Sequence, residues 1–319
     1  MKILVIGGSG FIGTRLVEVL ITAGHDVRIL DKNPSTAFNG LVTVGDVRDQ
    51  KALDDALRDM EIVYNLAAEH ADDVRPISLY YDVNVQGAKN IVSAADKNGV
   101  KKIIFTSTVA VYGLNKPHPE ETYPTEPFND YGKSKLMAED VFDRWAAQGE
   151  GRSLVTVRPV VIFGEGNQGN VANLIKQISG GKFFMVGDGT NKKSMGYVGN
   201  LVQFLVHAID LSEGKHLFNY ADKPDMVVAE LVSHIRSELG IRKPLPRLPY
   251  SLVLMGGYAF DVFARLTGKR FPISSIRIKK FCANTTVSTL ALESIGFKPA
   301  VSLKEGLSLM MGSMIKESS

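Results

Sequence analysis

The sequence has one cysteine among 319 residues, and it has no long apolar run. The lone thiol, Cys282, cannot form an internal disulfide, so a reducing compartment fits best. No stretch approaches the roughly 18 apolar residues of a membrane-spanning helix. The apolar stretch Ile3–Ile6 is also shorter than the roughly 7–15 residues of a secretory signal core. We therefore expect a cytoplasmic protein that begins with a buried strand.

Basic and acidic residues nearly balance, at 37 against 34, but their distribution is uneven. Residues 241–280 carry nine basic residues and one acid, a local balance of +8 that leaves −5 for the rest of the chain. Such asymmetry indicates an anionic partner. The nine cations are Arg242, Lys243, Arg247, Arg265, Lys269, Arg270, Arg277, Lys279 and Lys280.

Short β-branched runs alternate with helical stretches through the first half of the chain. We expect strands at 2–6, 27–30, 62–66, 102–107 and 154–158, and helices at 14–23, 84–98 and 131–147. This alternation is typical of an α/β fold with a parallel, doubly wound Rossmann sheet. Glycine and polar turns cluster from about Gly164 onwards. They predict a smaller C-terminal substrate-binding lobe.

A glycine-rich loop, Gly7–Gly13, joins the first predicted strand to the first predicted helix, which is the context that dinucleotide binding requires. One glycine permits the tight turn, one lets the backbone approach a pyrophosphate, and the last lets helix and strand pack closely. The helix N-terminus offers unpaired N–H groups to the phosphates. The residues expected at the cofactor are Gly7, Ser9, Gly10, Phe11, Ile12 and Gly13.

Asp31 ends the second predicted strand, at the distance of about 20 residues that this motif shows. A carboxylate there accepts hydrogen bonds from a ribose 2′-hydroxyl and repels a 2′-phosphate, which favours NAD over NADP. Lys32 softens that preference, because a cation attracts the phosphate. We predict an NAD-binding Rossmann domain over residues 1–163 and a lobe over 164–319 that is partly interwoven with it.

Tyr131 and Lys135 lie four residues apart on a predicted helix and therefore share one face. A free tyrosine has a pKa near 10 and is a poor base at neutral pH. A nearby ammonium favours the phenolate and lowers that pKa. The pair is thus suited to move a hydroxyl proton while hydride moves to a nicotinamide. Tyr-x-x-x-Lys alone is common by chance, so its assignment depends on the accompanying motifs.

Further motifs follow the glycine loop in a fixed order. They are Leu66-Ala67-Ala68, Asn84, Thr106-Ser107-Thr108 followed by Val111-Tyr112-Gly113, and Tyr131-Gly132-Lys133-Ser134-Lys135. The whole set resembles the extended short-chain dehydrogenase/reductase family, the NAD-dependent epimerases and dehydratases. The resemblance implies a triad in which Thr108 hydrogen-bonds the reacting hydroxyl, Tyr131 is the acid/base and Lys135 also binds the nicotinamide ribose. It further implies cofactor contacts from Lys32, Asp46, Val47, Leu66, Ala67, Ala68, Asn84, Thr106, Pro159 and Val161.

Two departures from the family pattern narrow the chemistry. Members that remove water across C5 and C6 carry Asp-Glu after the triad threonine, whereas Val109 and Ala110 stand here and cannot transfer protons. Dehydration is therefore not expected. Members that act on UDP-galactose carry Asn where Val161 stands, which weakens the expectation of nucleotide-sugar contacts.

Within the family, the closer resemblance is to 4-epimerases of N-acetylglucosaminyl-diphospho-undecaprenol, which serve O-antigen assembly. The resembling stretches are residues 45–50, 67–70, 80–87, 109–116, 275 and 279–283. The resemblance implies NAD-dependent C4 epimerisation of the lipid-linked GlcNAc to GalNAc through a transient 4-keto sugar. Three alternatives stay open: a 4-epimerase of UDP-GlcNAc or UDP-GalNAc, a hydroxysteroid-type dehydrogenase that releases NADH, and a Rossmann-fold NAD sensor without catalysis.

Substrate contacts are implied for His70, Asn170, Asn173 and Lys193, and more weakly for Asp72 and Asp73. Lys193 stands where the family's arginine grips the substrate diphosphate, so it keeps the charge but loses the bidentate fork. Asn170 and Asn173 begin a predicted helix and fit equally as N-caps. The other five histidines are scattered without metal-ligand spacing, so we expect no metal.

Residues 250–266 are dominated by apolar side chains and lie within the basic region. At a membrane interface, cations attract anionic lipid while apolar groups enter the headgroup boundary. This predicts peripheral binding to the cytoplasmic face of the inner membrane. A core or dimer helix with a solvated basic rim fits the same pattern, so a homodimer also stays open. No basic–aromatic platform indicates nucleic acid.

Overall fold

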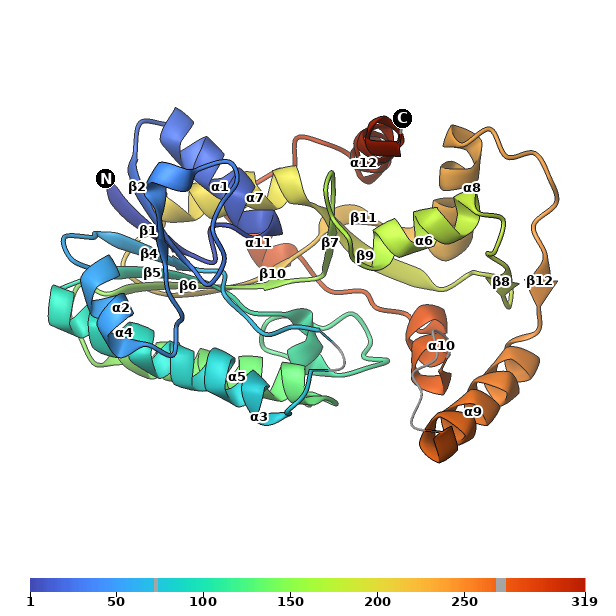
Figure 1. Cartoon of the computed structure of the whole chain (residues 1–319), viewed down its shortest axis with the longest axis horizontal. Helices are drawn as coiled ribbons and strands as arrows, with labels where there is room; N and C mark the ends of the chain where they lie inside the picture. Colours follow the sequence, from blue (N-terminus) through green and yellow to red (C-terminus); the bar gives the residue numbers. More distant parts are fainter. Residues whose placement is uncertain (72–73, 268–273, 319) are drawn as a thin grey trace.

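The computed structural model describes residues 1–71, 74–267 and 274–318, and a seven-stranded parallel sheet forms its centre (Figure 1). The strand order is β10-β6-β5-β4-β1-β2-β3. The chain winds outward from β1 in one direction and then, from β4, in the other. This is the doubly wound Rossmann arrangement, so the predicted fold class is confirmed. The strands are β1 (Lys2–Ile6), β2 (Asp26–Asp31), β3 (Val42–Val44), β4 (Ile62–Asn65), β5 (Lys102–Thr106), β6 (Ser153–Pro159) and β10 (Gly214–Tyr220).

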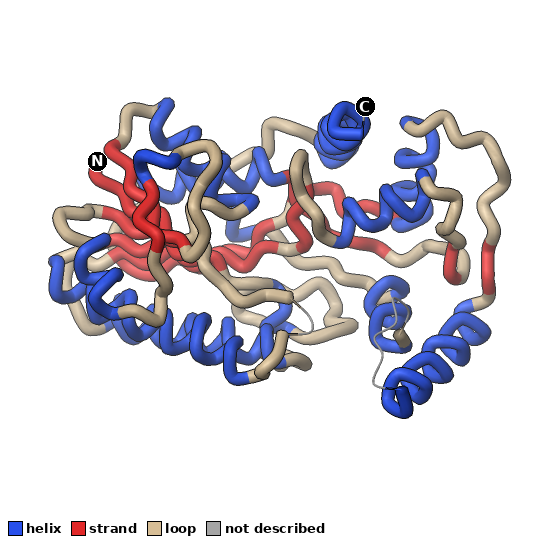
Figure 2. Tube along the Cα trace, in the orientation of Figure 1, coloured by secondary structure: helices blue, strands red, loops and turns tan. Residues whose placement is uncertain are grey.

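Helices cover both faces of the sheet, and Figure 2 shows the strands gathered between them. On one face α1 (Phe11–Thr22) packs against α7 (Val198–His207), and on the other α4 (Gly87–Asn98) packs between α2 (Gln50–Ala56) and α5 (Asp130–Ala147). Alternate residues of β1 enter separate cores, with Ile3 on the α1 side and Leu4 on the α4 side. Because both faces are buried, the strand reads as an unbroken apolar run.

The C-terminal half completes the Rossmann sheet as well as building its own lobe. Strand β10 pairs in parallel with β6 at the sheet edge, and α7 covers α1. The separate lobe holds a three-stranded sheet in the order β11-β9-β7. Its elements are β7 (Val161–Phe163), α6 (Asn170–Ser179), β8 (Met185–Val186), β9 (Lys192–Tyr197), β11 (Asp222–Val227), α8 (Val228–Glu238), β12 (Arg247–Leu248) and α12 (Leu303–Ser318).

Two further helices, α9 (Tyr250–Thr267) and α10 (Ser275–Cys282), pack on each other at the end of the molecule remote from the large sheet (Figure 1). They cross closely at Gly257, where an added Cβ would lie 2.5 Å from the Ile278 side chain. No helix in the described part of the chain is both long and apolar enough to cross a membrane. The predicted cations Lys269 and Arg270 lie outside the described residues.

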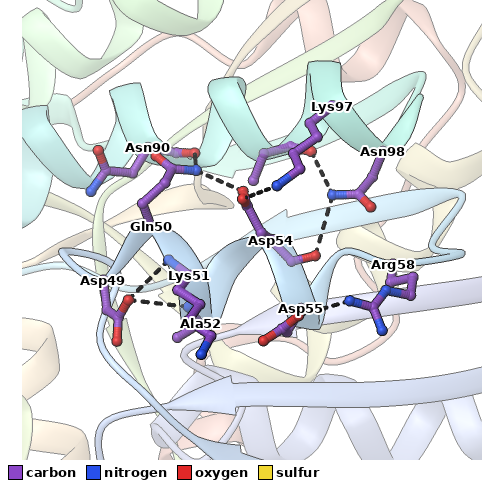
Figure 3. Close-up of polar contacts among 11 residues, drawn as sticks. Asp49, Gln50, Lys51, Ala52, Asp54, Asp55, Arg58, Asn90, Lys97 and Asn98 are labelled. Atoms are coloured by element: carbon purple, nitrogen blue, oxygen red, sulfur yellow. Dashed lines mark hydrogen bonds and ion pairs between the residues drawn. The ribbon is translucent and has the colours of Figure 1, made fainter.

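Shorter helical elements lie between the main strands and helices. They are α3 (Ser78–Tyr81), α11 (Leu290–Ser294), the 3₁₀ turns Asn39–Leu41, Val109–Tyr112 and Ala208–Asp210, and a π-helical turn at Asp82–Gln86. The helix predicted from residue 84 therefore begins at Gly87, after the π turn. In Figure 3 the Asp49 carboxylate caps α2 by accepting from the backbone N–H groups of Lys51 and Ala52 at 2.9 and 3.2 Å. Asp54 joins α2 to α4 through Lys97.

Candidate active site

The loop between β1 and α1 requires glycine at two positions. Gly7 has φ +83°, and an added Cβ would lie 2.8 Å from the Ala67 backbone nitrogen. At Gly13 an added Cβ would lie 2.2 Å from the Gly7 carbonyl oxygen. Helix α1 follows Gly10 without a side-chain cap, so its first-turn N–H groups are available to a ligand. This is the arrangement that binds a pyrophosphate.

Asp31 connects the end of β2 to this loop. Its Oδ2 accepts from the Ser9 N–H at 3.0 Å, and its Oδ1 accepts from the Asn33 N–H at 2.9 Å. A carboxylate has lone pairs left for a ribose hydroxyl after these two bonds. Lys32 lies 3.7 Å from a Glu69 oxygen, which offsets part of the charge that would attract a 2′-phosphate.

The remaining predicted cofactor residues differ in burial, and Leu66, Ala67 and Ala68 after β4 are half-buried. Asn84, Val47 and Thr106 are buried and bound to protein: the Asn84 amide bonds both the Glu69 backbone and Ser134 Oγ, and the Thr106 hydroxyl donates to the Asn65 carbonyl at 3.2 Å. Through Glu69, Asn84 holds the loop after β4 in place. Three others remain at least partly accessible at strand ends or beside them: Asp46, Pro159 and Val161.

These features fit NAD. The uncapped helix start and glycine approaches suit the pyrophosphate, and Asp31 suits the adenosine ribose. The Asp46 carboxylate accepts from the Arg48 guanidinium through bonds of 3.0 and 2.7 Å. These bonds hold the pKa of the Asp46 carboxyl below its ordinary value.

The three predicted triad residues lie together where α5 begins beside the turn after β5. The Thr108 hydroxyl accepts from the Ala110 N–H at 3.1 Å and hydrogen-bonds the Tyr131 phenol. Asn129 caps α5 by accepting from the Gly132 N–H at 2.9 Å, which fixes the first turn that carries Tyr131. Lys135 lies one turn further on, with Nζ 4.2 Å from the centre of the Phe105 ring.

Burial sets the proton affinities of the pair. It raises the pKa of the Tyr131 phenol, and the Thr108 hydrogen bond only partly offsets this. The expectation that Lys135 lowers the phenol's pKa below its ordinary value is therefore wrong for the protein alone. Lys135 is only 1% exposed, and burial lowers its own pKa to about 7. A lysine side chain that is only half protonated at pH 7 stabilises a neighbouring phenolate less than a fully charged one does.

The predicted substrate residues are dispersed. His70 is exposed after β4, and Asn170 and Asn173 are exposed on α6. Gly169 occupies the N-cap position of α6, so the interpretation of the two asparagines as N-caps is wrong. The Lys193 ammonium donates to the carbonyls of Lys280 and Ala283 at 2.8 and 2.7 Å, and burial lowers its pKa to about 8. Asp72 and Asp73 lie outside the described residues.

Two charged residues beneath the triad were missed. Glu139 on α5 and Arg158 on β6 form a buried ion pair. Glu139 stands four residues after Lys135 and so on the same helix face, and Arg158 is the last residue of the predicted strand 154–158. A charged residue in a strand buried on both faces indicates a paired partner, and that signal was available in the sequence.

A Rossmann domain with an uncapped glycine turn, an acidic residue at the end of β2 and a Thr-Tyr-Lys cluster defines the class of NAD-dependent short-chain dehydrogenases and reductases. Residues 3–221 match the NAD dependent epimerase/dehydratase family, and the chain belongs to that family. No group of three or more potential metal ligands occurs within the ranges described above.

Three proteins similar to this chain represent different activities within the family. It is 52% identical over 308 residues to the N-acetyl-α-D-glucosaminyl-diphospho-ditrans,octacis-undecaprenol 4-epimerase of Escherichia coli O157:H7, covering 96% of this chain and 93% of that protein. It is 27% identical to 3β-hydroxysteroid-dehydrogenase/decarboxylase isoform 1 of Arabidopsis thaliana, covering 95% and 77%. The UDP-glucose 4-epimerase of Thermotoga maritima, solved with UDP-glucose, superposes with a TM-score of 0.80 at 25% identity and full coverage of both chains.

Proposed function

We propose that this protein is an NAD-dependent sugar 4-epimerase that converts GlcNAc-diphospho-undecaprenol to GalNAc-diphospho-undecaprenol. The observation that carries the proposal is 52% identity, across 96% of this chain, to a 4-epimerase of that lipid-linked sugar. The clustering of Thr108, Tyr131 and Lys135 supplies the chemistry. A product of this kind supplies O-antigen assembly in lipopolysaccharide biosynthesis.

The chain's own residues manage the proton. Tyr131 takes the proton of the sugar C4 hydroxyl, and Thr108 holds that hydroxyl by a hydrogen bond. Lys135, when charged, favours the phenolate form of Tyr131. A bound NAD, which the Gly7–Gly13 loop and Asp31 would hold, would supply a reversible hydride acceptor for C4, and Tyr131 would return the proton when the transient 4-keto sugar is reduced from its opposite face. Val109 and Ala110 offer no second acid or base, so elimination of water has no proton carrier at these two positions.

Substrate recognition is proposed at the lobe. Lys193 lies on β9 with its ammonium among the carbonyls that end α10, where it would meet a diphosphate. Asn170 and Asn173 present exposed amides on α6 for the sugar or its phosphate, and His70 faces solvent after β4. Lysine keeps the charge for the diphosphate without the bidentate fork of arginine.

We further propose that α9 and α10 contact an anionic membrane surface on the cytoplasmic side. Exposed apolar side chains run along α9, and cations adjoin them on both helices. Lys279 stacks over the Tyr258 ring at 5.2 Å, and Arg265 is exposed. A polyprenyl substrate provides the reason for such a surface. The exposed apolar residues of α9 are Tyr250, Leu252, Met255, Tyr258, Phe260, Val262, Phe263 and Leu266.

Vesicle co-sedimentation tests the membrane contact. Each Lys or Arg near an anionic surface contributes about 1 kcal/mol, and the attraction fades within about 10 Å at 0.1 M salt. We expect binding that salt weakens but does not abolish, and that Arg265→Glu with Leu266→Ser reduces. Leu290→Ser removes another exposed leucine, on α11, and should leave binding unchanged. A wild-type protein that stays in the supernatant at low salt would contradict the contact and favour a soluble UDP-sugar.

Separate incubation with GlcNAc-diphospho-undecaprenol and with UDP-GlcNAc, in the presence of NAD, tests the substrate. We expect GalNAc on the lipid-linked sugar without accumulation of NADH. Conversion of UDP-GlcNAc alone would support the nucleotide-sugar alternative. Stoichiometric NADH would support a dehydrogenase, the activity named for the Arabidopsis relative. No turnover of either sugar with NAD retained would support an NAD sensor.

A further inference from the structure

A buried ion pair lies directly beneath the triad. Glu139 and Arg158 have side-chain exposures of 8% and 6%, and they meet through two bonds, Nε to Oε1 at 3.0 Å and Nη2 to Oε2 at 2.6 Å. Replacing such a pair by apolar residues of similar volume is often neutral or stabilising. A contribution to stability is therefore a weak explanation for two buried charges at this position.

The ion pair is hydrogen-bonded to residues at both ends of the turn that carries Thr108. The Ser107 hydroxyl, one residue before Thr108, donates to Glu139 Oε1. At the other end of the turn, Arg158 Nη1 donates to the Tyr112 hydroxyl at 2.7 Å. Because Glu139 belongs to α5, these bonds join the Thr108 turn to the helix that carries Tyr131 and Lys135.

The same pair extends to the C-terminal half of the chain. The Tyr112 hydroxyl donates to Asn219 Oδ1 on β10 at 2.8 Å. Asn219 in turn donates from its backbone N–H to Glu121 Oε1 at 2.7 Å, and Arg158 Nη1 donates to the Glu121 carbonyl at 3.2 Å. The network thus spans β6, α5, β10 and the loop between the turn and α5, which limits relative movement of the groups that must meet the sugar hydroxyl.

Electrostatics gives the pair a second effect. Glu139 lies one helical turn after Lys135, and its carboxylate raises the pKa of the Lys135 ammonium, against the larger lowering by burial. The titratable and polar groups that face Glu139 are Lys135, Arg158 and Ser107, and those that face Arg158 from the other side are Tyr112 and Glu121.

We propose that Glu139 and Arg158 are positioning residues for the acid/base step: they hold the Thr108 turn against α5, and Glu139 places a carboxylate one helical turn from Lys135. Neither residue is placed in contact with sugar or nucleotide. The inference rests on the proposed function for its kinetic test, but the ionisation of Lys135 can be followed without any sugar.

Glu139→Gln is the first variant, because glutamine keeps the shape and an acceptor for Ser107 while removing the charge. Loss of the carboxylate lowers the pKa of Lys135. If the pKa of Lys135 falls from about 7 by about one pH unit, the fraction of Lys135 present as ammonium drops about tenfold at pH 8 and less than about twofold at pH 6. We expect kcat of the NAD-loaded enzyme to fall in that pH-dependent way. Asp140→Asn removes an exposed charge from the next position of α5 and should leave the profile unchanged.

Glu139→Gln with Arg158→Met separates this role from folding. The single variant leaves a buried guanidinium unpaired, whereas the double variant removes both charges. We expect the double variant to recover much of the Tm that the single variant loses. The pH profile of its kcat should stay displaced to lower pH relative to wild type. Equal loss of kcat at pH 6 and pH 8, or a profile restored together with Tm, would overturn the proposal.

NMR titration of labelled lysine side chains in the NAD-loaded protein gives a readout that needs no sugar. Lys135→Met identifies the Lys135 signal. We expect Lys135 to titrate at lower pH in Glu139→Gln than in the wild type. If wild-type protein turns over no sugar but this displacement is seen, the proposed function fails and the positioning role stands. An undisplaced titration in an active enzyme would overturn the positioning role alone.

Discussion

Replacing Lys135 by Met should stabilise the protein while abolishing its activity. Lys135 is 1% exposed, and burial lowers the pKa of its ammonium from 10.5 to about 7. The folded state therefore tolerates the charge poorly. Methionine fills a similar volume beside Phe105 and carries no charge. Functional sites often hold groups that are unfavourable for folding, and their removal raises stability at the expense of function.

The magnitude and its pH dependence follow from the same pKa. Between pH 7 and 10.5 the unfolded chain binds more protons at this lysine than the folded chain does, so the free energy of unfolding rises with pH. The buried ammonium destabilises the folded state by the full amount below pH 7. This destabilisation disappears above the pKa that the lysine has in the unfolded chain. At about 1.4 kcal/mol per pKa unit, it is about 4 kcal/mol at pH 7 and about 2 kcal/mol at pH 9.

Urea unfolding of nucleotide-free protein at these two pH values measures the effect. We expect Lys135→Met to raise the free energy of unfolding by about 4 kcal/mol at pH 7 and by about half as much at pH 9. Lys133→Met replaces an exposed lysine on the same helix and should change it by less than about 0.5 kcal/mol. A Lys135→Met protein that is less stable than wild type, or whose gain is the same at both pH values, would refute the reasoning.

Three further variants test the other parts of the site. Tyr131→Phe should lower kcat at least about 100-fold, the scale of general acid–base catalysis, while NAD stays bound; turnover near the wild-type rate would remove Tyr131 from the mechanism. Asp31→Ala should narrow the ratio of NAD to NADP affinity, measured by calorimetry, and an unchanged ratio would mean that Asp31 does not reach the ribose. Gly13→Ala should destabilise the fold by about 1–3 kcal/mol and weaken NAD binding, because its Cβ would meet the Gly7 carbonyl at 2.2 Å. Gly312→Ala, which meets open space in α12, is its control and should leave both properties intact.

The large sheet was predictable because its strands have a strong local signal. A run such as Lys2–Ile6, closed by glycines and followed by a helical stretch, has few other interpretations. Strand β10 was not assigned, because its place beside β6 comes from pairing across more than fifty residues of chain. Such long-range pairing has no local signature. The π turn at Asp82–Gln86 escaped for the same reason, since Asn84 there is held by Glu69 and Ser134.

The site was predictable where residue type and spacing fix the chemistry. The spacing of Tyr131 and Lys135 predicted that they share one helix face, and the family resemblance added Thr108. The direction of the phenol's pKa shift depends on burial, which spacing does not reveal. Lys193 shows the same limit. The family resemblance implied an anion contact for Lys193, whereas its ammonium also bonds the carbonyls of Lys280 and Ala283.

The central claim is that oxidation at C4 is followed by return of the same hydride to the other face of the sugar. GlcNAc-diphospho-undecaprenol carrying deuterium at C4 tests this directly when it is incubated with the enzyme and catalytic NAD. The account predicts GalNAc-diphospho-undecaprenol that retains deuterium at C4, with none released to water. Product that has lost the deuterium to solvent, or deuterium recovered in free NADH with a ketone left on the lipid, would contradict it.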